Sequence, residues 1–342
     1  MKRHAVVRIL VGLSVAALSV TGESAVANCA DRPDASLGVS GASGGREAVI
    51  VGVITDASTL CINGLSIQTD GQTAVSMDGK VATLGALAIG QVAVIAASLV
   101  GGTLKAARVM VSHEVIGPVT DVDIAGSELS VMGRRVVLRT SARSAPGGAL
   151  LESLKLGDVL RVSGLRDARG EIDGTRIDLA PASEPSVANG RLVLETERTP
   201  VLAGVRLRFS DGVAVSAGMD EKEVRITGRW TGRELVVEDV VIDPLGAILD
   251  RTVRVSLQGY LANDGSGISV AGLRVRISGT TRFDGGDRGS LRSDSEVSAI
   301  GAVRSGRQVD VERIRIAAPR PASNRGLLLP FDASPPRPVM TR

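Results

Sequence analysis

One short apolar pattern occurs four times along the chain and limits what it can fold into. An apolar residue at position x is followed by apolar residues at x+5 and x+7, and a glycine precedes each copy by two or three residues. The copies are Leu104, Val109 and Val111; Ile172, Ile177 and Leu179; Leu235, Val240 and Ile242; and Val309, Ile314 and Ile316. Such self-similarity indicates several copies of one structural unit. We therefore expect a tandem array of one small module.

Two glycine positions recur upstream of each copy. The first lies in the middle of an apolar stretch, at Gly52, Gly117, Gly190 and Gly259. The second lies in a predicted turn, one residue after a short apolar segment, at Gly64, Gly133, Gly204 and Gly272. Apolar and polar residues alternate after the second glycine, as in Val205, Leu207 and Phe209. Alternation with a period of two between glycine turns predicts half-buried antiparallel strands.

The spacing inside the repeated pattern suggests a closed barrel. Residues x and x+5 are an odd number apart, so a regular strand would direct them to opposite faces. Either a β-bulge between them or burial of both faces would reconcile the pattern, and both are expected in small, sharply coiled barrels. The predicted fold class is all-β, with four tandem small OB-like antiparallel β-barrel modules. Their predicted boundaries are 47–111, 114–180, 188–243 and 254–317.

The order of these motifs resembles the bacterial extracytoplasmic domain of unknown function 5666. Module 2 carries the fullest set of matching residues: Gly117, Gly133, Gly157, Asp158, Val162, Gly164 and Ile177. Module 1 has Gln91 in place of the aspartate. Modules 3 and 4 depart further, with Glu223-Val224 and Glu296-Val297 where Gly-Asp-x-Val is expected. The resemblance implies tandem β modules and export, and it implies no activity.

The two ends of the chain differ from its middle. Residues 1–27 have a basic start, an apolar stretch at 9–20 and the small residues Ala25-Val26-Ala27, which predicts a secretory signal peptide. The apolar stretch is shorter than the roughly 20 residues of a membrane span, and no transmembrane segment is expected in the mature chain. Residues 28–46 are expected to be a flexible lead-in, and residues 318–342 a disordered tail rich in Pro and Arg.

Export affects how the two cysteines are interpreted. Cys29 and Cys61 form an even pair in an oxidising compartment, so a disulfide is expected, the alternative being two unrelated thiols. The predicted location is periplasmic or extracellular. A lipoprotein lipidated at Cys29 is less favoured, because Asn28 stands where a small residue is expected.

Arginine outnumbers lysine 35 to 5, and arginines recur just after the second glycine of three modules. These positions are candidate anion contacts, for an acidic polymer or for lipid headgroups, because guanidinium groups bind such oxygens well. The alternative is an ordinary solvated strand face. The candidate residues are Arg134, Arg135, Arg206, Arg208, Arg274 and Arg276.

No catalytic residue, metal site or cofactor is expected. His113 is the only histidine after the leader, and it is expected to be a linker residue in contact with solvent. The carboxylate pairs Asp121/Asp123 and Glu195/Glu197 are expected on solvated strand faces. Segments 263–267 and 284–287 are expected to be turns, because they lack the full ligand ladder of a calcium loop.

The expected function is non-enzymatic binding or scaffolding in the bacterial cell envelope, with an unidentified envelope protein or polyanion as partner. The alternative is an OB-like array that binds oligonucleotides or polyanions through arginine-bearing barrel faces. Nucleic acid is disfavoured because the chain has one Trp, one Tyr and three Phe for base stacking. A hydrolase would need a cleft with two facing carboxylates.

Overall fold

The computed structural model describes Cys29, Leu37 and residues 47–100, 103–145, 151–194, 200–214, 216–242, 246–249, 252–263, 267–304 and 308–318. The predicted signal peptide lies outside these residues, as do all but two positions of the lead-in and nearly all of the tail. Within the described residues, no helix has the length and apolarity that a membrane crossing requires.

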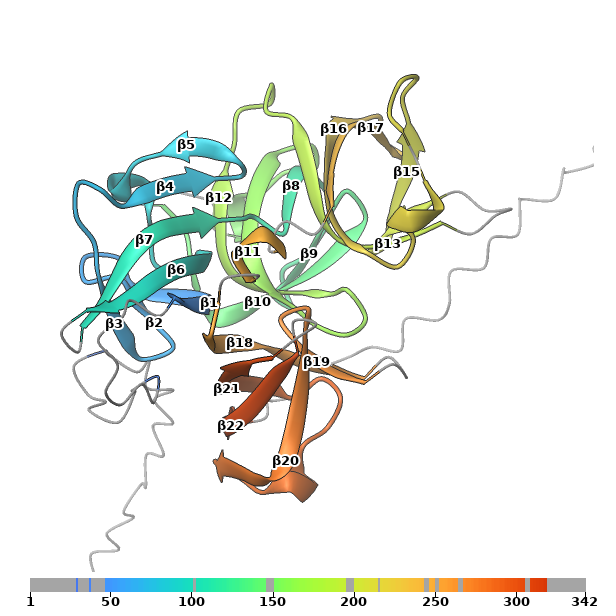
Figure 1. Ribbon diagram of the computed structural model, residues 1–342. Coiled ribbons are helices and arrows are strands. Elements are labelled where there is room, and N and C mark those ends of the chain that lie inside the picture. The colour runs from blue at the N-terminus through green and yellow to red at the C-terminus, as the bar shows by residue number, and fades with distance from the viewer. Residues whose placement is uncertain are drawn as a thin grey trace, which may run out of the picture.

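Module 2 shows the barrel in its simplest form (Figure 1). Its strands are β8 (Val115–Asp123), β9 (Glu128–Val131), β10 (Arg134–Arg143), β11 (Val159–Arg166) and β12 (Ile172–Leu179). The first strand pairs antiparallel with the second and the fourth, and the third pairs with the fifth in parallel. Antiparallel pairing of β9 with β10 and of β11 with β12 closes the barrel. This is a five-stranded, OB-like architecture.

The other three modules repeat the same pairing, so the prediction of an all-β array of four tandem barrels is confirmed. Module 1 contains β1 (Glu47–Asp56), β2 (Cys61–Ile62), β3 (Leu65–Gln68), β6 (Val92–Val100) and β7 (Thr103–Val111), with an inserted hairpin of β4 (Ala74–Met77) and β5 (Lys80–Ala82). Module 3 contains β13 (Ser186–Val193), β14 (Val201–Leu202), β15 (Val205–Phe209), β16 (Glu223–Trp230) and β17 (Leu235–Ile242). Module 4 contains β18 (Arg254–Asn263), β19 (Ile268–Val270), β20 (Leu273–Asp284), β21 (Glu296–Val303) and β22 (Val309–Ile316).

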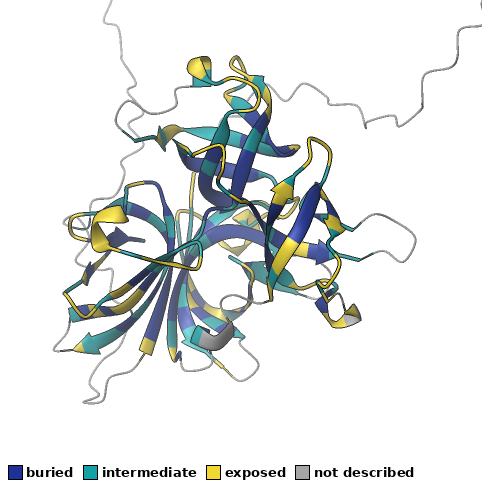
Figure 2. Ribbon diagram, turned by 90° about the horizontal axis from the view of Figure 1, so that it is seen from above, coloured by how far each residue is buried: buried dark blue, intermediate teal, exposed yellow. Residues whose placement is uncertain are grey.

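Short helical turns occupy connections between strands. They are η2 (Leu84–Ala86), η3 (Leu151–Ser153), η4 (Ala217–Met219), α1 (Gly246–Leu249) and η5 (Arg288–Ser290). Buried residues follow the strands, whereas exposed residues gather at loops and strand ends (Figure 2).

The fifth strand of every barrel is bulged, which resolves the odd spacing of the repeated pattern. In module 2, Ser163 pairs with Arg176 and Gly164 pairs with Gly174, so Thr175 has no partner across the ladder. Equivalent residues are skipped at Ala107, Glu238 and Glu312. The bulge lets residues x and x+5 both face inward. Residue x+7 is not always core, since Leu179 and Ile242 are 51% and 45% exposed.

Glycine faces the bulge in three of the modules. A Cβ at Gly164, Gly228 or Gly301 would overlap a backbone carbonyl oxygen of the fifth strand. Module 1 has Ala97 at this position. The glycines therefore allow the fourth strand to approach the bulged backbone closely.

The two recurring glycine positions lie close together, because the hairpin turn that contains the second glycine packs on the strand that contains the first. The second belongs to a two-residue hairpin turn in which both residues have positive φ, for example 52° at Met132 and 79° at Gly133. A Cβ on the first-strand glycine would press on the other turn residue: at Gly117 it would lie 2.7 Å from Met132 Cγ. The first strand therefore needs a glycine where the hairpin folds over it.

First strands also join the barrels in pairs. β1 pairs in parallel with β18, with Val51 opposite Leu257, and β8 pairs antiparallel with β13, with Val115 opposite Ala188. These pairings merge modules 1 and 4 into a 12-stranded sheet and modules 2 and 3 into a 10-stranded sheet. One hydrophobic core fills modules 2 and 3, while Val49 and Val51 of β1 pack into the core of module 4.

We expect Gly228→Ala to destabilise the protein more than Gly133→Ala. Gly133 has open space around its Cβ position, so alanine there meets only the strain of a positive φ, about 1 kcal/mol. At Gly228 the new Cβ overlaps the Val236 carbonyl oxygen, and overpacking of this kind costs roughly 1–3 kcal/mol or more. Urea unfolding of the two variants measures the difference. An equal loss would contradict the close approach at the bulge.

Candidate binding surfaces

The six candidate arginines occupy two kinds of position on the third strand of their barrels. Arg135, Arg206 and Arg274 are equivalent and direct their side chains outward, away from the core. Arg134 takes the preceding, inward position, which Val205 and Leu273 fill with apolar side chains in modules 3 and 4.

Arg134 is 1% exposed and links modules 2 and 3. Its Nη1 donates to the carbonyl oxygens of Glu114 at 2.9 Å and Asn189 at 2.8 Å, and its Nη2 donates to the Glu114 carboxylate at 3.2 Å. Its Nε donates to the Gly170 carbonyl. Burial lowers the pKa of Arg134 to about 10, against the opposing charge of Glu114. Arg134 is therefore a structural link and not part of an anion-contacting face.

Three of the outward arginines pair with carboxylates of their own barrels. Arg135 donates to Glu128 and, at 2.9 Å, to Glu171. Arg208 lies 2.7 Å from Glu234, and Arg276 lies 2.7 Å from Asp310. Arg206 and Arg274 are exposed. Because module 2 buries one candidate arginine and neutralises the other, the candidate positions do not form one continuous cationic stripe across the modules.

The expectation of a solvent-exposed His113 is wrong, since the residue is 1% exposed. Asp78, in the turn between β4 and β5, accepts a hydrogen bond from the His113 backbone N–H at 3.0 Å and lies 2.6 Å from its ring Nδ1. Arg225 of module 3 donates to the same carboxylate at 2.8 Å. Burial alone would raise the pKa of Asp78, but the hydrogen bonds from His113 and the charge of Arg225 outweigh it and lower the pKa.

This cluster holds the segment that connects the first two barrels. Asn189 of module 3 donates its side-chain amide to the His113 carbonyl and its backbone N–H to the Glu114 carbonyl. Arg225 also reaches the Ser112 hydroxyl at 3.4 Å. The connection between modules 1 and 2 is therefore held both by module 3 and by the Asp78-Gly79 hairpin turn of module 1.

A second buried carboxylate, Asp173 of β12, lies between modules 2 and 4. The Tyr260 hydroxyl donates to Asp173 Oδ2 at 2.7 Å, and Arg139 Nε donates to it at 2.6 Å. Arg139 also pairs with Glu296 of module 4 at 2.9 Å. Burial raises the pKa of Asp173 to about 7, although the charge of Arg139 opposes the shift. Asp173 can therefore take up a proton near neutral pH.

A pocket of about 200 Å³ lies between modules 3 and 4. Its lining mixes both signs of charge and includes Arg274, one of the six candidate arginines. The lining residues are Arg191, Glu221, Glu223, Gly267, Ile268, Ser269, Gly272 and Arg274. Arg191 pairs with Glu221, and Glu223 pairs with Arg166 of module 2. The pocket walls are thus held by ion pairs within and between modules.

The remaining carboxylate motifs have structural surroundings. Asp121 and Asp123 are exposed, and Asp123 accepts a turn hydrogen bond from Gly126. Asp287 caps η5 by accepting from the Ser290 backbone N–H at 2.9 Å. Glu195 and Glu197 lie outside the described residues, as does most of segment 263–267. In the part of the chain that the structure describes, no three His, Cys, Asp or Glu side chains cluster as metal ligands would.

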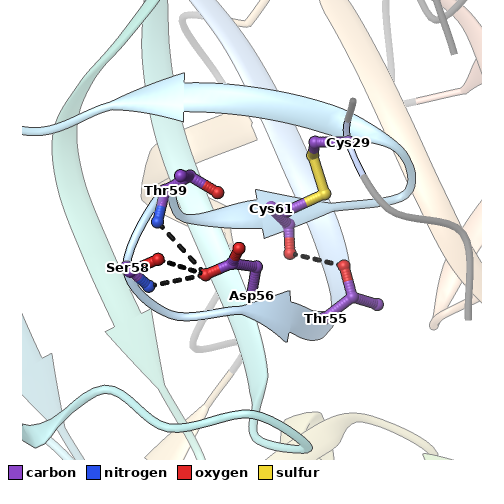
Figure 3. The surroundings of a disulfide bond; sticks show 6 residues. All are labelled: Cys29, Thr55, Asp56, Ser58, Thr59 and Cys61. Atoms are coloured by element: carbon purple, nitrogen blue, oxygen red, sulfur yellow. Dashed lines mark hydrogen bonds between the residues drawn. A yellow bond between two sulfur atoms is a disulfide. The ribbon is translucent and has the colours of Figure 1, made fainter. Parts of the chain in front are cut away.

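The predicted disulfide between Cys29 and Cys61 is confirmed, with Cα atoms 5.8 Å apart (Figure 3). Thr55 donates its hydroxyl to the Cys61 carbonyl, and Asp56 accepts from the backbone and hydroxyl of Ser58 in the neighbouring turn. Leu37 is 4% exposed and packs into the core of module 1. At these two described positions the lead-in contacts module 1.

Comparison with family models identifies modules 1, 2 and 4. The model of the family described as Domain of unknown function (DUF5666) matches residues 49–110, 116–178 and 258–315, which together make up more than half of the chain. Module 3 lies between the second and third matched segments, although its strands pair in the same order. Comparison with curated proteins and with solved structures gives no match.

We expect Arg134→Ala to lower the free energy of unfolding by about 3–5 kcal/mol, because it leaves the Glu114 carboxylate and three carbonyl groups without their buried donor. Arg206→Ala removes an exposed arginine from the outward position of the third strand in module 3 and should cost less than about 0.5 kcal/mol. Denaturant unfolding of the full chain measures both changes. Similar small losses would show that Arg134 does not link the modules.

Asp173 should make the protein less stable as pH rises. Its folded-state pKa of about 7 lies above the ordinary value of 3.8, so between these values the folded protein binds more protons than the unfolded chain, and the free energy of unfolding falls. Asp173→Asn should remove this loss and gain about 1–3 kcal/mol on the native protein between about pH 5 and pH 8. Asp121→Asn, at an exposed site, is the control. Parallel pH profiles for native protein and Asp173→Asn would refute the assignment.

Proposed function

The chain belongs to the DUF5666 family, and we propose that it is an exported, non-enzymatic binding or scaffolding protein of the bacterial cell envelope. The observation that carries this proposal is the joining of its four barrels through shared sheets and buried ion pairs. Such joints hold the outer faces of the barrels in a fixed arrangement. A fixed set of surfaces suits simultaneous contact with large partners.

The disulfide supports export. Disulfides persist in oxidising compartments and are rare in the cytosol. Cys29, which follows the predicted leader closely, is one of the bonded cysteines. A thiol in a disulfide cannot carry the thioether of a lipid anchor, so we propose a periplasmic or extracellular protein that is not lipidated at Cys29.

The use of its titratable residues supports a non-enzymatic role. His113, Asp78 and Arg225 satisfy one another between modules 1, 2 and 3. Asp173 and Arg139 do so between modules 2 and 4. The titratable side chains that could act as general acids or bases therefore bind one another at the junctions between barrels.

Oligonucleotide binding along a row of barrels remains the competing proposal. It would use arginines at equivalent positions of several modules, but Arg135 is paired with Glu128 and Glu171 while Arg134 is buried. The chain also has few aromatic rings to stack on bases. These observations favour scaffolding.

The test is cross-linked capture from envelope fractions of the native host, using the full disulfide-bonded chain as bait. We expect specific envelope proteins to be recovered, and their recovery to fall at least several-fold with Asp78→Ala, which removes the acceptor joining modules 1 and 3. Asp123→Ala, at the exposed end of β8 in module 2, is the matched control. No recovery above a bait-free control, or equal recovery with Asp78→Ala, would count against a scaffold built on the joined barrels.

A second measurement addresses the competing proposal. Fluorescence anisotropy with a single-stranded oligonucleotide at physiological salt should show no saturation at micromolar protein, where even non-specific binders respond. Micromolar binding that is lost when Arg135, Arg206 and Arg274 are all changed to Gln would favour the oligonucleotide-binding array.

A further inference from the structure

Module 3 leaves open a strand edge that the other three barrels cover. In modules 1, 2 and 4, the chain loops away after the third strand and then returns to pair with the fifth strand beyond the bulge. β4 returns in this way along β7 (Figure 1), and the second half of β20 returns along β22. In module 3 the pairing of β15 with β17 ends at Val237, just before the bulge at Glu238. Among the described residues, no strand other than β16 therefore pairs with β17 between Glu238 and Ile242.

The length of chain that follows β15 explains the difference. From Phe209, where the pairing with β17 ends, the chain soon reaches η4 at Ala217. The matching connection in module 4 runs from Ile277 to η5 at Arg288, and it is longer, so it has residues for a returning segment. Module 3 is also the barrel that the family model does not match. The open edge therefore distinguishes module 3 from the other barrels.

The open edge leaves a core position of module 3 incompletely covered. The position five residues into the repeated pattern is buried in the other modules, at 0% exposure for Val109, 3% for Ile177 and 0% for Ile314. Its equivalent in module 3, Val240, packs on the shared core but is only half-buried. In module 4 the returning segment places Phe283 beside Ile314, and Phe283 packs on the core there. An added strand with an apolar side chain would cover Val240 in the same way.

The open edge also carries two carboxylates. Glu238 and Asp239 are exposed, and in the part of the chain that the structure describes neither forms an ion pair. Val241 and Ile242, which follow on the same strand, are 43% and 45% exposed. Because side chains alternate along a strand and Val240 packs on the core, Asp239 and Val241 lie on the outward face. A strand added here would therefore have an acidic neighbour on its outward face and an apolar one on its inward face.

This combination selects which chain can use the edge. An exposed strand edge is a template for pairing with another chain, and charged side chains restrict that pairing. Two copies of β17 placed edge to edge would bring the carboxylates of both copies close together, and like charges across a strand pair are destabilising. Lysine or arginine beside Asp239 would be stabilising instead. The edge therefore favours a basic strand over a second copy of itself.

We propose that the β17 edge of module 3, residues 238–242, binds an extended segment of a partner protein in which basic and apolar residues alternate. The segment adds to the sheet as a strand parallel to β17, as β4 is to β7 and β20 is to β22. Its backbone pairs with β17, an apolar side chain covers Val240, and a basic side chain lies beside Asp239. The proposal rests on the binding role proposed above and specifies the kind of partner.

The test uses a short, fluorescently labelled peptide of alternating lysine and valine, titrated into the full disulfide-bonded chain and followed by anisotropy. We expect saturable binding. A peptide of alternating glutamate and valine should bind at least several-fold more weakly, because its charges repel Glu238 and Asp239. A peptide with the lysines and valines in two separate blocks should also bind several-fold more weakly, because it cannot place valines on one face and lysines on the other.

Charge reversal on the protein locates the site. Glu238→Lys with Asp239→Lys should weaken binding of the lysine–valine peptide at least several-fold and strengthen binding of the glutamate–valine peptide. Asp121→Lys with Asp123→Lys reverses two exposed carboxylates on β8 in module 2 and should leave both affinities unchanged. Thermal unfolding of each variant confirms that it is folded. Equal loss in the two variants would show attraction to the whole acidic surface and would overturn the proposal.

Hydrogen exchange measures whether the peptide joins the sheet. We expect the lysine–valine peptide to slow exchange of the outward backbone amides of residues 238–242 at least several-fold, and to leave β12 of module 2 unchanged. Unchanged exchange at 238–242, equal binding of the block peptide, or a dimer of this chain that excludes the peptide would overturn the proposal. Failure of peptide binding with successful capture of envelope proteins would also overturn it, and would leave the scaffold function standing.

Discussion

The fold depends on one close contact: a hairpin turn lies directly on the bare backbone of the first strand in each barrel. Gly117 and Gly259 leave room for Met132 and Ala271 of the turn, and a side chain on either glycine would collide with it. The contact brings strands one to three together and lets the barrel close around small aliphatic side chains. With the barrel closed on one side, part of the first strand's other edge is available to a second barrel, which β1 and β8 use to pair with β18 and β13.

Buried charge holds the pairs of barrels to one another. Arg134, Asp78 and Asp173 each belong to one module and contact at least one other. A buried charge is tolerated only when its partners are fixed, and removal of one partner is costly. The barrels therefore have a defined arrangement. The charged side chains buried at the junctions are not accessible to ligands.

Most of the barrel could be predicted from the sequence. Contacts within one module give rise to the recurring glycines, to the alternation after them and to the repeated apolar pattern. These patterns recur in all four modules. The bulge was one of two alternatives that the spacing left open, and the structure selects it at Thr175 and its equivalents. The disulfide followed from the even pair of cysteines. Module 3 departs from the family pattern, yet Glu221 adopts the positive φ that Gly157 has at the corresponding turn.

The sequence by itself determined the repeated barrel and its turns, because these depend on local spacing, and its disulfide, because the chain has a single pair of cysteines. Only the tertiary structure decided which barrels pair and which charged residues are buried. His113 was expected in solvent, since nothing in its neighbourhood along the chain reveals Asp78 or Arg225 beside it. The inward position of Arg134 is implied by its alternation with Val136, but its acceptors lie on another module. Contacts between modules join residues that are far apart in the chain, and each contact occurs once. A repeated sequence pattern therefore cannot reveal them.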